Sequence, residues 1–439
     1  MKINKKYILI LVFISSLQGF SQEILTKKEA LKITLENNFG IKIANNNLEV
    51  AKNNTSIFNS GFLPTTAVST GANYRRDNQD VTFQDGTSRS IAGAITKSYN
   101  ASVNVNYTIF DGLGRKYNYQ QLKETYNLSE LQARETIENT YLQLFTTYFQ
   151  IARLSENANN LSEALGISKR RLLRAKYQYD YGQATKLEML NAEVDVNNDS
   201  ILFITAKQQL NNVKRSLNII LGIDKEVNFV VETDVDFNKI MNFDELQQKT
   251  LANNSLLKQN EQNVAISEFN IKINASNYLP TLGLNTSYGW NKSENPVTSF
   301  LAGATSNGLN TGLSLSWNLF DGGITKTRVA NAKIVLDNQQ ILAEQQKTTI
   351  ENSLKNTWEN YNNQLFIIGA QDKNVLTAQN NFDRTEERYK LGQITSIEFR
   401  QAQINFINAK TALNNATFDA KLIELQLLQL SGDILNIAF

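Results

Sequence analysis

Residues 99–110 read Tyr-Asn-Ala-Ser-Val-Asn-Val-Asn-Tyr-Thr-Ile-Phe, and this stretch decides the fold. Its odd-numbered positions, from Tyr99 to Ile109, are apolar, and the positions between them are Asn, Ser or Thr. An alternation with a period of two predicts a β-strand with one apolar and one polar face. Because the polar face carries no charge, it is more typical of a lumen than of the wet face of a soluble sandwich. The pattern therefore favours a strand that lies between lipid and a water-filled channel.

A second strand of this kind lies near residue 315, and both strands have a partner. Partner strands are expected at 65–74 and 281–290, with hairpin loops of about 20 residues at 75–97 and 291–307. A length of around ten residues is what a tilted membrane-spanning strand needs. The apolar positions of the second strand are Leu313, Leu315, Trp317 and Leu319, and they alternate with Ser314, Ser316 and Asn318.

Four strands are too few to close a barrel by themselves. An open sheet edge is not viable in lipid, because its backbone groups would have no hydrogen-bond partner. The strands are therefore expected to join those of other copies of the chain. Three copies would supply twelve strands, which is enough for a barrel with a lumen.

The chain contains a tandem repeat, which three landmarks reveal. Phe62-Leu63-Pro64-Thr65 recurs 216 positions later as Tyr278-Leu279-Pro280-Thr281. Tyr107 to Gly112 and Tyr179 to Gln183 recur 210 positions later, at Trp317 to Gly322 and Tyr389 to Gln393. We expect repeat 1 at 22–222, with strands at about 63–110 and a long helix at about 114–180. A connector at 223–243 precedes repeat 2 at 244–439, with strands at about 279–320 and a long helix at about 324–390.

Apolar periodicity predicts long coiled-coil helices outside the strands. Spacings of three and four residues, sustained over 402–430, are typical of a coiled-coil seam. A helix of about 67 residues would be roughly 100 Å long, and half-length helices would be roughly 50 Å long. The half-length helices, expected to stack end to end in pairs, are at 27–60, 186–221, 244–276 and 396–430.

The first 21 residues are interpreted as a signal peptide. Lys2, Lys5 and Lys6 precede a short apolar run, and small residues follow at Gly19 and Ser21. Removal of 1–21 would leave 41 basic and 42 acidic residues, a balance that gives no basic footprint for nucleic acid. The chain has no Cys and no His, so it lacks the commonest general base and metal ligand. We therefore expect no enzyme activity and no cofactor.

Taken together, the landmarks resemble the TolC family of outer-membrane efflux and secretion channels. They are Leu-Pro-Thr at 63–65 and 279–281, Phe-Asp-Gly at 110–112 and 320–322, and Tyr-x-x-Gly at 179–182 and 389–392. The resemblance implies an α+β membrane protein: a homotrimer whose 12-stranded β-barrel, in outer-membrane lipid, continues into the periplasm as an α-helical barrel. It also implies a passive channel of a tripartite efflux or type I secretion system, with a periplasmic adaptor protein and an inner-membrane transporter as partners.

The resemblance also assigns roles to the two turns between the long and half-length helices, which would form the periplasmic tip. Gly182, Gln183, Gly392 and Gln393 match adaptor-contact positions, although helix-stop glycines would give the same pattern. The residues Glu188, Tyr389 and Glu398 match pore and gate positions, and a solvated helix face is the alternative for each. The chain departs from the family pattern at Ile394, where some members have a latch arginine, and at Gln401, where a second pore acid can occur.

Two other classes of protein remain open at this point. A self-sufficient porin would not need helices of roughly 100 Å. A non-channel periplasmic coiled-coil scaffold would not need strands with a lipid-compatible face. The strands therefore favour the channel.

Overall fold

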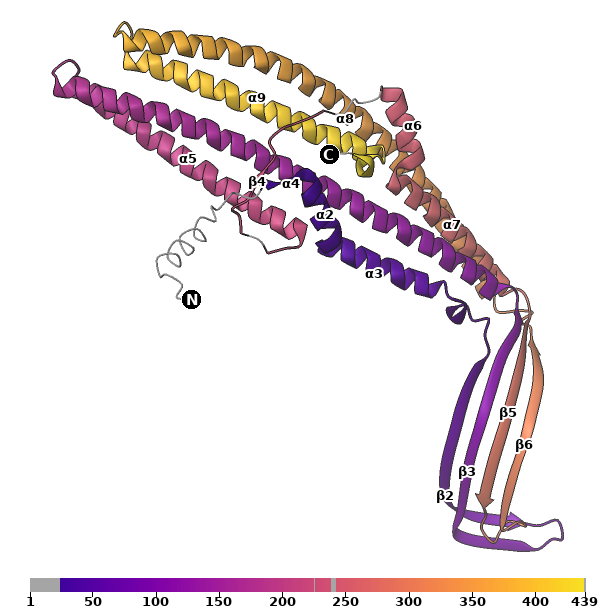
Figure 1. The fold of residues 1–439 in the computed structure, drawn as a ribbon. Coiled ribbons are helices and arrows are strands. Elements are labelled where there is room, and N and C mark those ends of the chain that lie inside the picture. Colours follow the sequence, from indigo (N-terminus) through magenta and orange to yellow (C-terminus); the bar gives the residue numbers. More distant parts are fainter. Residues whose placement is uncertain (1–23, 225, 238–241, 438–439) are drawn as a thin grey trace, which may run out of the picture. The chain divides into compact units, whose positions relative to one another are not determined.

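The computed structural model of the protein describes residues 24–437, apart from residue 225 and residues 238–241 (Figure 1). The signal peptide expected at 1–21 lies outside the described residues. The chain forms two compact units. One consists of the described residues within 1–46, 132–258 and 346–439, and the other of 47–131 and 259–345. Each unit thus combines segments from both halves of the chain.

Helices make up most of the chain. The two longest, α4 (Gly114–Asp180) and α8 (Ile324–Lys390), have 67 residues each and occupy the ranges that the sequence indicates. A short turn connects each of them to a following helix, α5 (Lys186–Leu221) or α9 (Ser396–Leu430). In the part of the chain that the structure describes, no helix is both long and apolar enough to span a membrane. The shorter helical elements are α2 (Lys27–Asn37), α3 (Phe39–Asn54), η1 (Ile57–Asn59), α6 (Phe243–Asn253), α7 (Ser255–Ser276) and η2 (Ile434–Asn436).

The half-length helices expected at 27–60 and 244–276 are not continuous, because an asparagine interrupts each of them. Asn38 Nδ2 donates to the carbonyl of Ile220, in the last turn of α5, at 2.7 Å. Asn254 Nδ2 makes the matching bond to the carbonyl of Leu430 at 3.0 Å. The Oδ1 atoms of both asparagines accept backbone N–H groups at the start of the next helix. Each asparagine thus satisfies two helix ends at once, a tertiary role that helical periodicity does not reveal.

Glycines end α5 and α9 at the same two junctions. Gly222 has a φ of +67° and Gly432 a φ of +72°. A Cβ on Gly222 would lie 2.4 Å from the carbonyl oxygen of Asn37, and a Cβ on Gly432 would lie 2.9 Å from that of Asn253. Both positions therefore require glycine, for the left-handed conformation and for the close approach.

Replacing Gly222 with alanine is expected to lower the thermal stability of the protein. The left-handed conformation costs a residue with a Cβ about 1–2 kcal/mol, and the contact with Asn37 adds to that cost. Gly392→Ala is a matched control, because Gly392 has a φ of +71° but a Cβ there would meet open space. Circular dichroism melts in detergent should give a lower Tm for Gly222→Ala than for Gly392→Ala. Equal Tm values would contradict the importance of the close approach.

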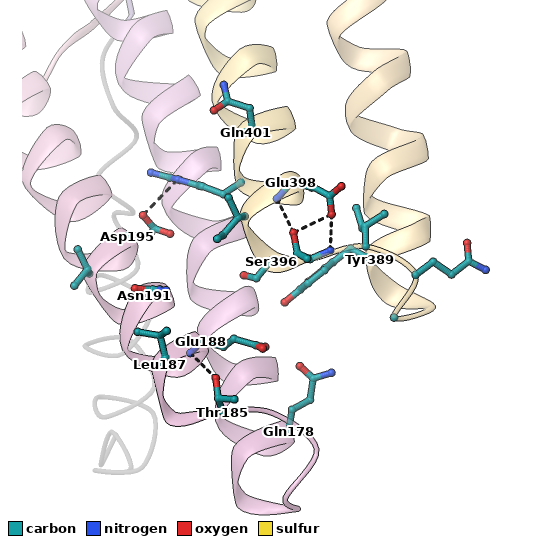
Figure 2. Close-up of a pocket in the computed structure, with 17 residues that line it drawn as sticks. Gln178, Thr185, Leu187, Glu188, Asn191, Asp195, Tyr389, Ser396, Glu398 and Gln401 are labelled. Atoms are coloured by element: carbon teal, nitrogen blue, oxygen red, sulfur yellow. Dashed lines mark hydrogen bonds and ion pairs between the residues drawn. The ribbon is translucent and has the colours of Figure 1, made fainter.

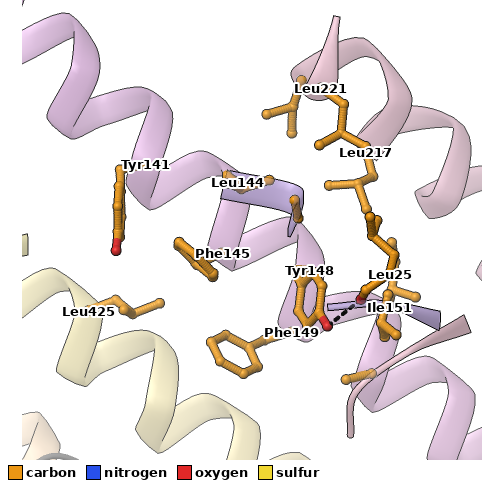
Figure 3. Packing of buried hydrophobic residues seen from close by; sticks show 14 of the residues in the cluster. Leu25, Tyr141, Leu144, Phe145, Tyr148, Phe149, Ile151, Leu217, Leu221 and Leu425 are labelled. Atoms are coloured by element: carbon orange, nitrogen blue, oxygen red, sulfur yellow. Dashed lines mark hydrogen bonds between the residues drawn. The ribbon is translucent and has the colours of Figure 1, made fainter. Parts of the chain in front are cut away.

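The largest apolar core lies where α4 meets α5, α9, β1 (Ile24–Leu25) and β4 (Val230–Val231) (Figure 3). At its centre are the α4 side chains of Phe145, Tyr148 and Phe149, all almost fully buried. The Tyr148 hydroxyl donates to the carbonyl of Leu25 at 2.7 Å and accepts from the backbone N–H of Glu232 at 3.0 Å. One buried side chain therefore binds both the segment before α2 and the segment that connects α5 to α6.

The second unit contains a four-stranded antiparallel sheet. Its order is β2 (Thr65–Thr82), β3 (Ser88–Asp111), β5 (Thr281–Glu294) and β6 (Gly303–Ser316). Val103 lies opposite Val68 on one side and Tyr288 on the other, and Tyr288 lies opposite Leu309. The apolar positions therefore form rows across the strands on one face. The α+β fold class is confirmed.

Both hairpins are longer than the sequence indicates. The loops expected at 75–97 and 291–307 are reduced to 83–87 and 295–302, because the strands stay paired through charged residues. Lys97 lies opposite Glu294, for example, and their charged groups are 3.8 Å apart. Strand pairing is a backbone property, so it continues where the alternation of apolar side chains stops. The prediction of loops of about 20 residues was wrong for that reason.

The last strand is shorter than the sequence indicates. Alternation predicts a strand as far as residue 320, but β6 ends at Ser316. In the first half of the chain, the matching residues 107–111 pair with β5. They extend beyond Thr65, the first residue of β2, which pairs with Asn106. Because β6 is the last strand of the sheet, residues 317–320 have no strand beside them among the described residues.

Candidate functional site at the helical turns

The turns after α4 and α8 have the same backbone conformation. Gly182 and Gly392 have φ values of +73° and +71°. The backbone N–H groups of Gln183 and Gln393 donate to carbonyls five residues earlier, at 2.7 and 2.9 Å. These are the bonds of a helix that ends in a left-handed glycine. A Cβ would meet open space at both glycines, so the backbone there is accessible.

The helices that follow the turns begin with threonine caps. Thr185 Oγ1 accepts the backbone N–H of Glu188, and Thr395 Oγ1 accepts that of Glu398. At the second turn the Glu398 carboxylate also accepts the backbone N–H and the hydroxyl of Thr395, both at 2.8 Å, which completes a capping box (Figure 2). The hydrogen bond from the Thr395 backbone, followed by that from its hydroxyl, lowers the pKa of Glu398 below its usual value. Both turns carry the Thr-x-x-Glu signature, which could have predicted these caps.

A cavity of about 890 Å³ lies between the start of α5 and the turn that leads into α9 (Figure 2). Five of the seven residues predicted from the sequence line it. The other two, Gly182 and Gln183, lie outside it, and Gln183 borders a smaller hollow with Tyr177 and Tyr181. The structure therefore brings most of the predicted residues together. The five that line the cavity are Glu188, Tyr389, Gly392, Gln393 and Glu398.

Tyr389 connects three helices. Its ring stacks on that of Phe399 in α9, with centroids 4.8 Å apart and planes only 1° from parallel. The guanidinium of Arg174, in α4, lies 5.0 Å from the same ring and donates to the carbonyl of Lys390 at 2.8 Å. Ile394, which stands where some channels of the TolC family have a latch arginine, packs against the apolar cluster that contains Phe399. Gln401 is exposed, and its side-chain amide donates to Asn405.

A largely buried ionic network, which the sequence did not predict, lies within four helical turns of the caps. Arg400 donates two hydrogen bonds to Asp199, both at 2.7 Å, so the pair is bidentate. Ser168 Oγ, in α4, donates to the same carboxylate at 2.6 Å. Asp195 lies between the guanidinium groups of Arg171 and Arg400. Two positive and two negative groups therefore bind α4, α5 and α9 to one another.

Burial alone would raise the pKa of Asp199. The hydrogen bonds from Arg400 and Ser168 outweigh this effect, and the pKa lies below its usual value of 3.8. The carboxylate is therefore ionised at neutral pH. Because its pKa is lower in the folded state, the pair stabilises the fold above about pH 4, and this contribution is lost as the pH falls below that.

The sequence held one signal of this network. Asp199 interrupts the apolar seam of α5, and a buried charge in a seam requires a partner. Its counterpart in the second repeat is Ala409, and the counterpart of Arg400 in the first repeat is Leu190. The network is therefore a departure from the repeat. Arg400, the partner of Asp199, lies 201 residues away in the sequence, so periodicity could not identify it.

Removing either member of the pair is expected to destabilise the protein. Loss of one partner from a buried ion pair costs about 3–5 kcal/mol, and partial exposure of Arg400 favours the lower end. The substitutions Asp199→Ala and Arg400→Leu introduce the residues of the other repeat. Each should lower the Tm in detergent more than the double variant does, because the double variant leaves no unpaired buried charge.

The control is Asp419→Ala, which removes the more exposed Arg153–Asp419 ion pair. An exposed pair is worth about 0–1 kcal/mol, so its Tm should change little. If the Tm shift of the double variant equalled the sum of the shifts of the two single variants, Arg400 and Asp199 would not act as a pair.

No described residues form a group of three or more His, Cys, Asp or Glu side chains placed to bind a metal ion. What the site offers is a solvent-accessible turn backbone, ionised carboxylates and a rigid link between helical hairpins. Such an arrangement can present charge and backbone hydrogen-bonding groups at the surface of the turns.

The chain matches a known family over most of its length. The sequence model of the family described as "Outer membrane efflux protein" matches residues 30–223 and 246–433. The outer membrane protein TolC of Vibrio cholerae is 22% identical over 310 residues, which cover 70% of each chain. The proteases secretion protein PrtF of Dickeya chrysanthemi is 19% identical over 430 residues, 93% of this chain and 88% of PrtF.

Solved structures share the fold. The Campylobacter jejuni CmeC outer membrane channel superposes with a TM-score of 0.79 at 17% identity, covering 93% of this chain and 85% of CmeC. The family match extends over both halves of the chain, and the fold agrees with it. This chain therefore belongs to the outer membrane efflux protein family, the TolC-like channels of the outer membrane.

Proposed function

We propose that three copies of this chain form one passive channel across the outer membrane. Each copy contributes its four strands to a twelve-stranded β-barrel, and the helices continue the conduit as an α-helical barrel in the periplasm. The observation that carries the proposal is the sheet, which has one apolar and one neutral polar face. Among the residues that the structure describes, no strand pairs with the outer edge of β2 or of β6. A periplasmic scaffold would not need such a sheet.

The two faces of the sheet suit lipid and water respectively. Val68, Leu313 and Leu315 are each at least 70% exposed on the apolar face, where a solvated sheet would normally carry polar side chains. The other face has a shallow hollow lined mainly by amide and hydroxyl side chains, among them Asn104, Asn285 and Ser287. Uncharged polar groups of this kind suit the lumen of a channel that conducts varied substrates.

The channel works with two partners in this proposal, a periplasmic adaptor protein and an inner-membrane transporter that supplies the energy. The turns at Gly182–Gln183 and Gly392–Gln393 are the adaptor contacts, because their backbone is accessible. Glu188, Tyr389 and Glu398 belong to the gate. The tripartite system exports small molecules or, like the system of PrtF, proteins. The proposal includes export of the chain by a signal peptide at 1–21 and a repeat organisation of 22–222 and 244–439, joined by 223–243.

The oligomer and its location can be tested together. We expect the protein to fractionate with the outer membrane, to have the mass of a trimer in mild detergent, and to conduct ions in planar bilayers. The physical reason is that only a shared barrel satisfies the edges of β2 and β6 in lipid. A monomer in the soluble periplasmic fraction after gentle extraction would rule out the channel.

The role of Glu398 can be tested through ion selectivity. Three Glu398 carboxylates around one axis would favour cations. Glu398→Gln removes the charge and keeps a side chain that can still complete the capping box. We expect the cation-to-anion permeability ratio, taken from reversal potentials, to fall toward one. Glu359→Gln, an exposed position on α8 far from the turn, is the control. An unchanged ratio in Glu398→Gln would remove this residue from the pore.

A further inference from the structure

We infer that β6 of one subunit pairs with β2 of the next in a single antiparallel register, in which Trp317 lies opposite the partner subunit's Val68. This inference rests on the proposed trimer and adds to it an interface defined residue by residue. It follows from the repeat, from the pairing inside the sheet and from the exposure of β6.

The two hairpins have the same internal register. Thr65 lies opposite Asn106 in the first, and Thr281 lies opposite Ser316 in the second. Thr281 is 216 positions after Thr65, and Ser316 is 210 positions after Asn106, which are the two offsets of the sequence repeat. In three dimensions, β5 is therefore the counterpart of β2, and β6 is the counterpart of β3.

The sheet contains one junction between the two halves of the chain, formed by β3 and β5. Adding 210 to the residue numbers of β3 gives β6, and subtracting 216 from those of β5 gives β2. The β3–β5 junction therefore becomes a junction between β6 and the β2 strand of the partner subunit. The pairs Tyr107–Leu284, Val105–Thr286 and Val103–Tyr288 are the template. They become Trp317 with the partner subunit's Val68, Leu315 with the partner subunit's Thr70, and Leu313 with the partner subunit's Ala72.

The faces of the two strands agree with this register. Val68 shares the apolar face with Val103, and Leu315 shares it with Leu282. On the polar face, Ser316 lies opposite the partner subunit's Ser69. A slip by one residue would reverse the faces of one strand and place apolar side chains in the lumen. The arrangement of apolar and polar faces therefore excludes register shifts by an odd number of residues. The pairs of the β3–β5 junction exclude shifts by two residues.

Exposure shows what β6 lacks. Leu313 is 70% exposed whereas its counterpart Val103 is 44% exposed, and Trp317 is 56% exposed against 37% for Tyr107. Among the described residues, Val103 has a strand on either side, whereas Leu313 has only β5 beside it. Tyr107 has β5 beside it, whereas Trp317 follows the end of β6 and has no neighbouring strand there. A second strand beside β6 would cover the difference.

The register also accounts for the early end of β6. In β3, residues 107–111 are held by β5 alone, with a bulge at Ile109 between Thr108 and Phe110. In the trimer, residues 317–321 would be held in the same way by the partner's β2, with a bulge at Leu319. In the part of a single chain that the structure describes, no strand lies beside these residues. Their strand forms when the subunits assemble.

Disulfide cross-linking tests the register, because the chain has no cysteine of its own. Two double variants, Leu315→Cys with Thr70→Cys and Ser316→Cys with Ser69→Cys, place cysteines at directly opposite positions. Adjacent antiparallel pairs alternate in Cα separation between about 4.5 and 5.5 Å, so both are within the range that a disulfide spans. Leu315→Cys with Val68→Cys is the matched control, since diagonal neighbours are about 7–8 Å apart.

After mild oxidation of outer membranes, the two in-register variants should shift from monomer to covalent dimer and trimer on non-reducing gels. Reduction should restore the monomer, and the control should stay monomeric. Cross-linking of the control pair alone would overturn the register while leaving the trimer intact. Absence of all cross-links in a protein with the mass of a trimer would overturn the β6–β2 pairing. A protein that is a monomer in detergent would overturn the proposed channel as well.

Discussion

The hydrogen-bonding groups along the outer edges of β2 and β6 are the constraint on which the architecture depends. β3 and β5 have a strand on either side, whereas β2 and β6 have one each. In hydrocarbon, an unpaired backbone group costs several kcal/mol, so a lipid-facing sheet with two free edges is not stable. In the proposed trimer the repeat provides the solution, because β6 and β2 are the counterparts of the two strands that pair at the β3–β5 junction. Under this proposal, one chain carries both strands of the contact between its copies.

The same duplication is visible in the helical unit, where the two copies share their helix junctions and helix caps. Asn38 joins α2 to α3 and Asn254 joins α6 to α7, whereas Thr185 and Thr395 cap the helices after the turns. The copies differ at the ionic network, where Arg400 and Asp199 replace the apolar residues of the other copy. A strictly symmetric chain could not form this pair. The scaffold is thus repeated, whereas the Arg400–Asp199 pair between the two helical hairpins has no counterpart at the matching positions of the repeat.

The chemistry near the turns is that of held carboxylates. Glu398 is fixed by its capping box and Asp199 by Arg400, and hydrogen bonding lowers the pKa of both groups. Both remain charged across the physiological range. An exposed acid can present its charge to a conduit, whereas a buried and paired acid can only bind helices together. The site therefore combines a surface charge with an internal ion pair, and Tyr389 packs against Phe399 of α9 and Arg174 of α4.

The sequence by itself determined the features that depend on local period and on duplication. Alternation over Tyr99–Ile109 identified the strands, and the offsets of 210 and 216 identified the repeat and the family resemblance. Five of the seven predicted turn residues line one cavity, although their roles in gating and adaptor contact stay predictions. Only the tertiary structure decided where the strands end, where Asn38 breaks a helix, and which residue neutralises Asp199. Those features depend on backbone pairing or on side chains about 200 residues apart. Neither kind of contact produces a periodic pattern of residues in the sequence.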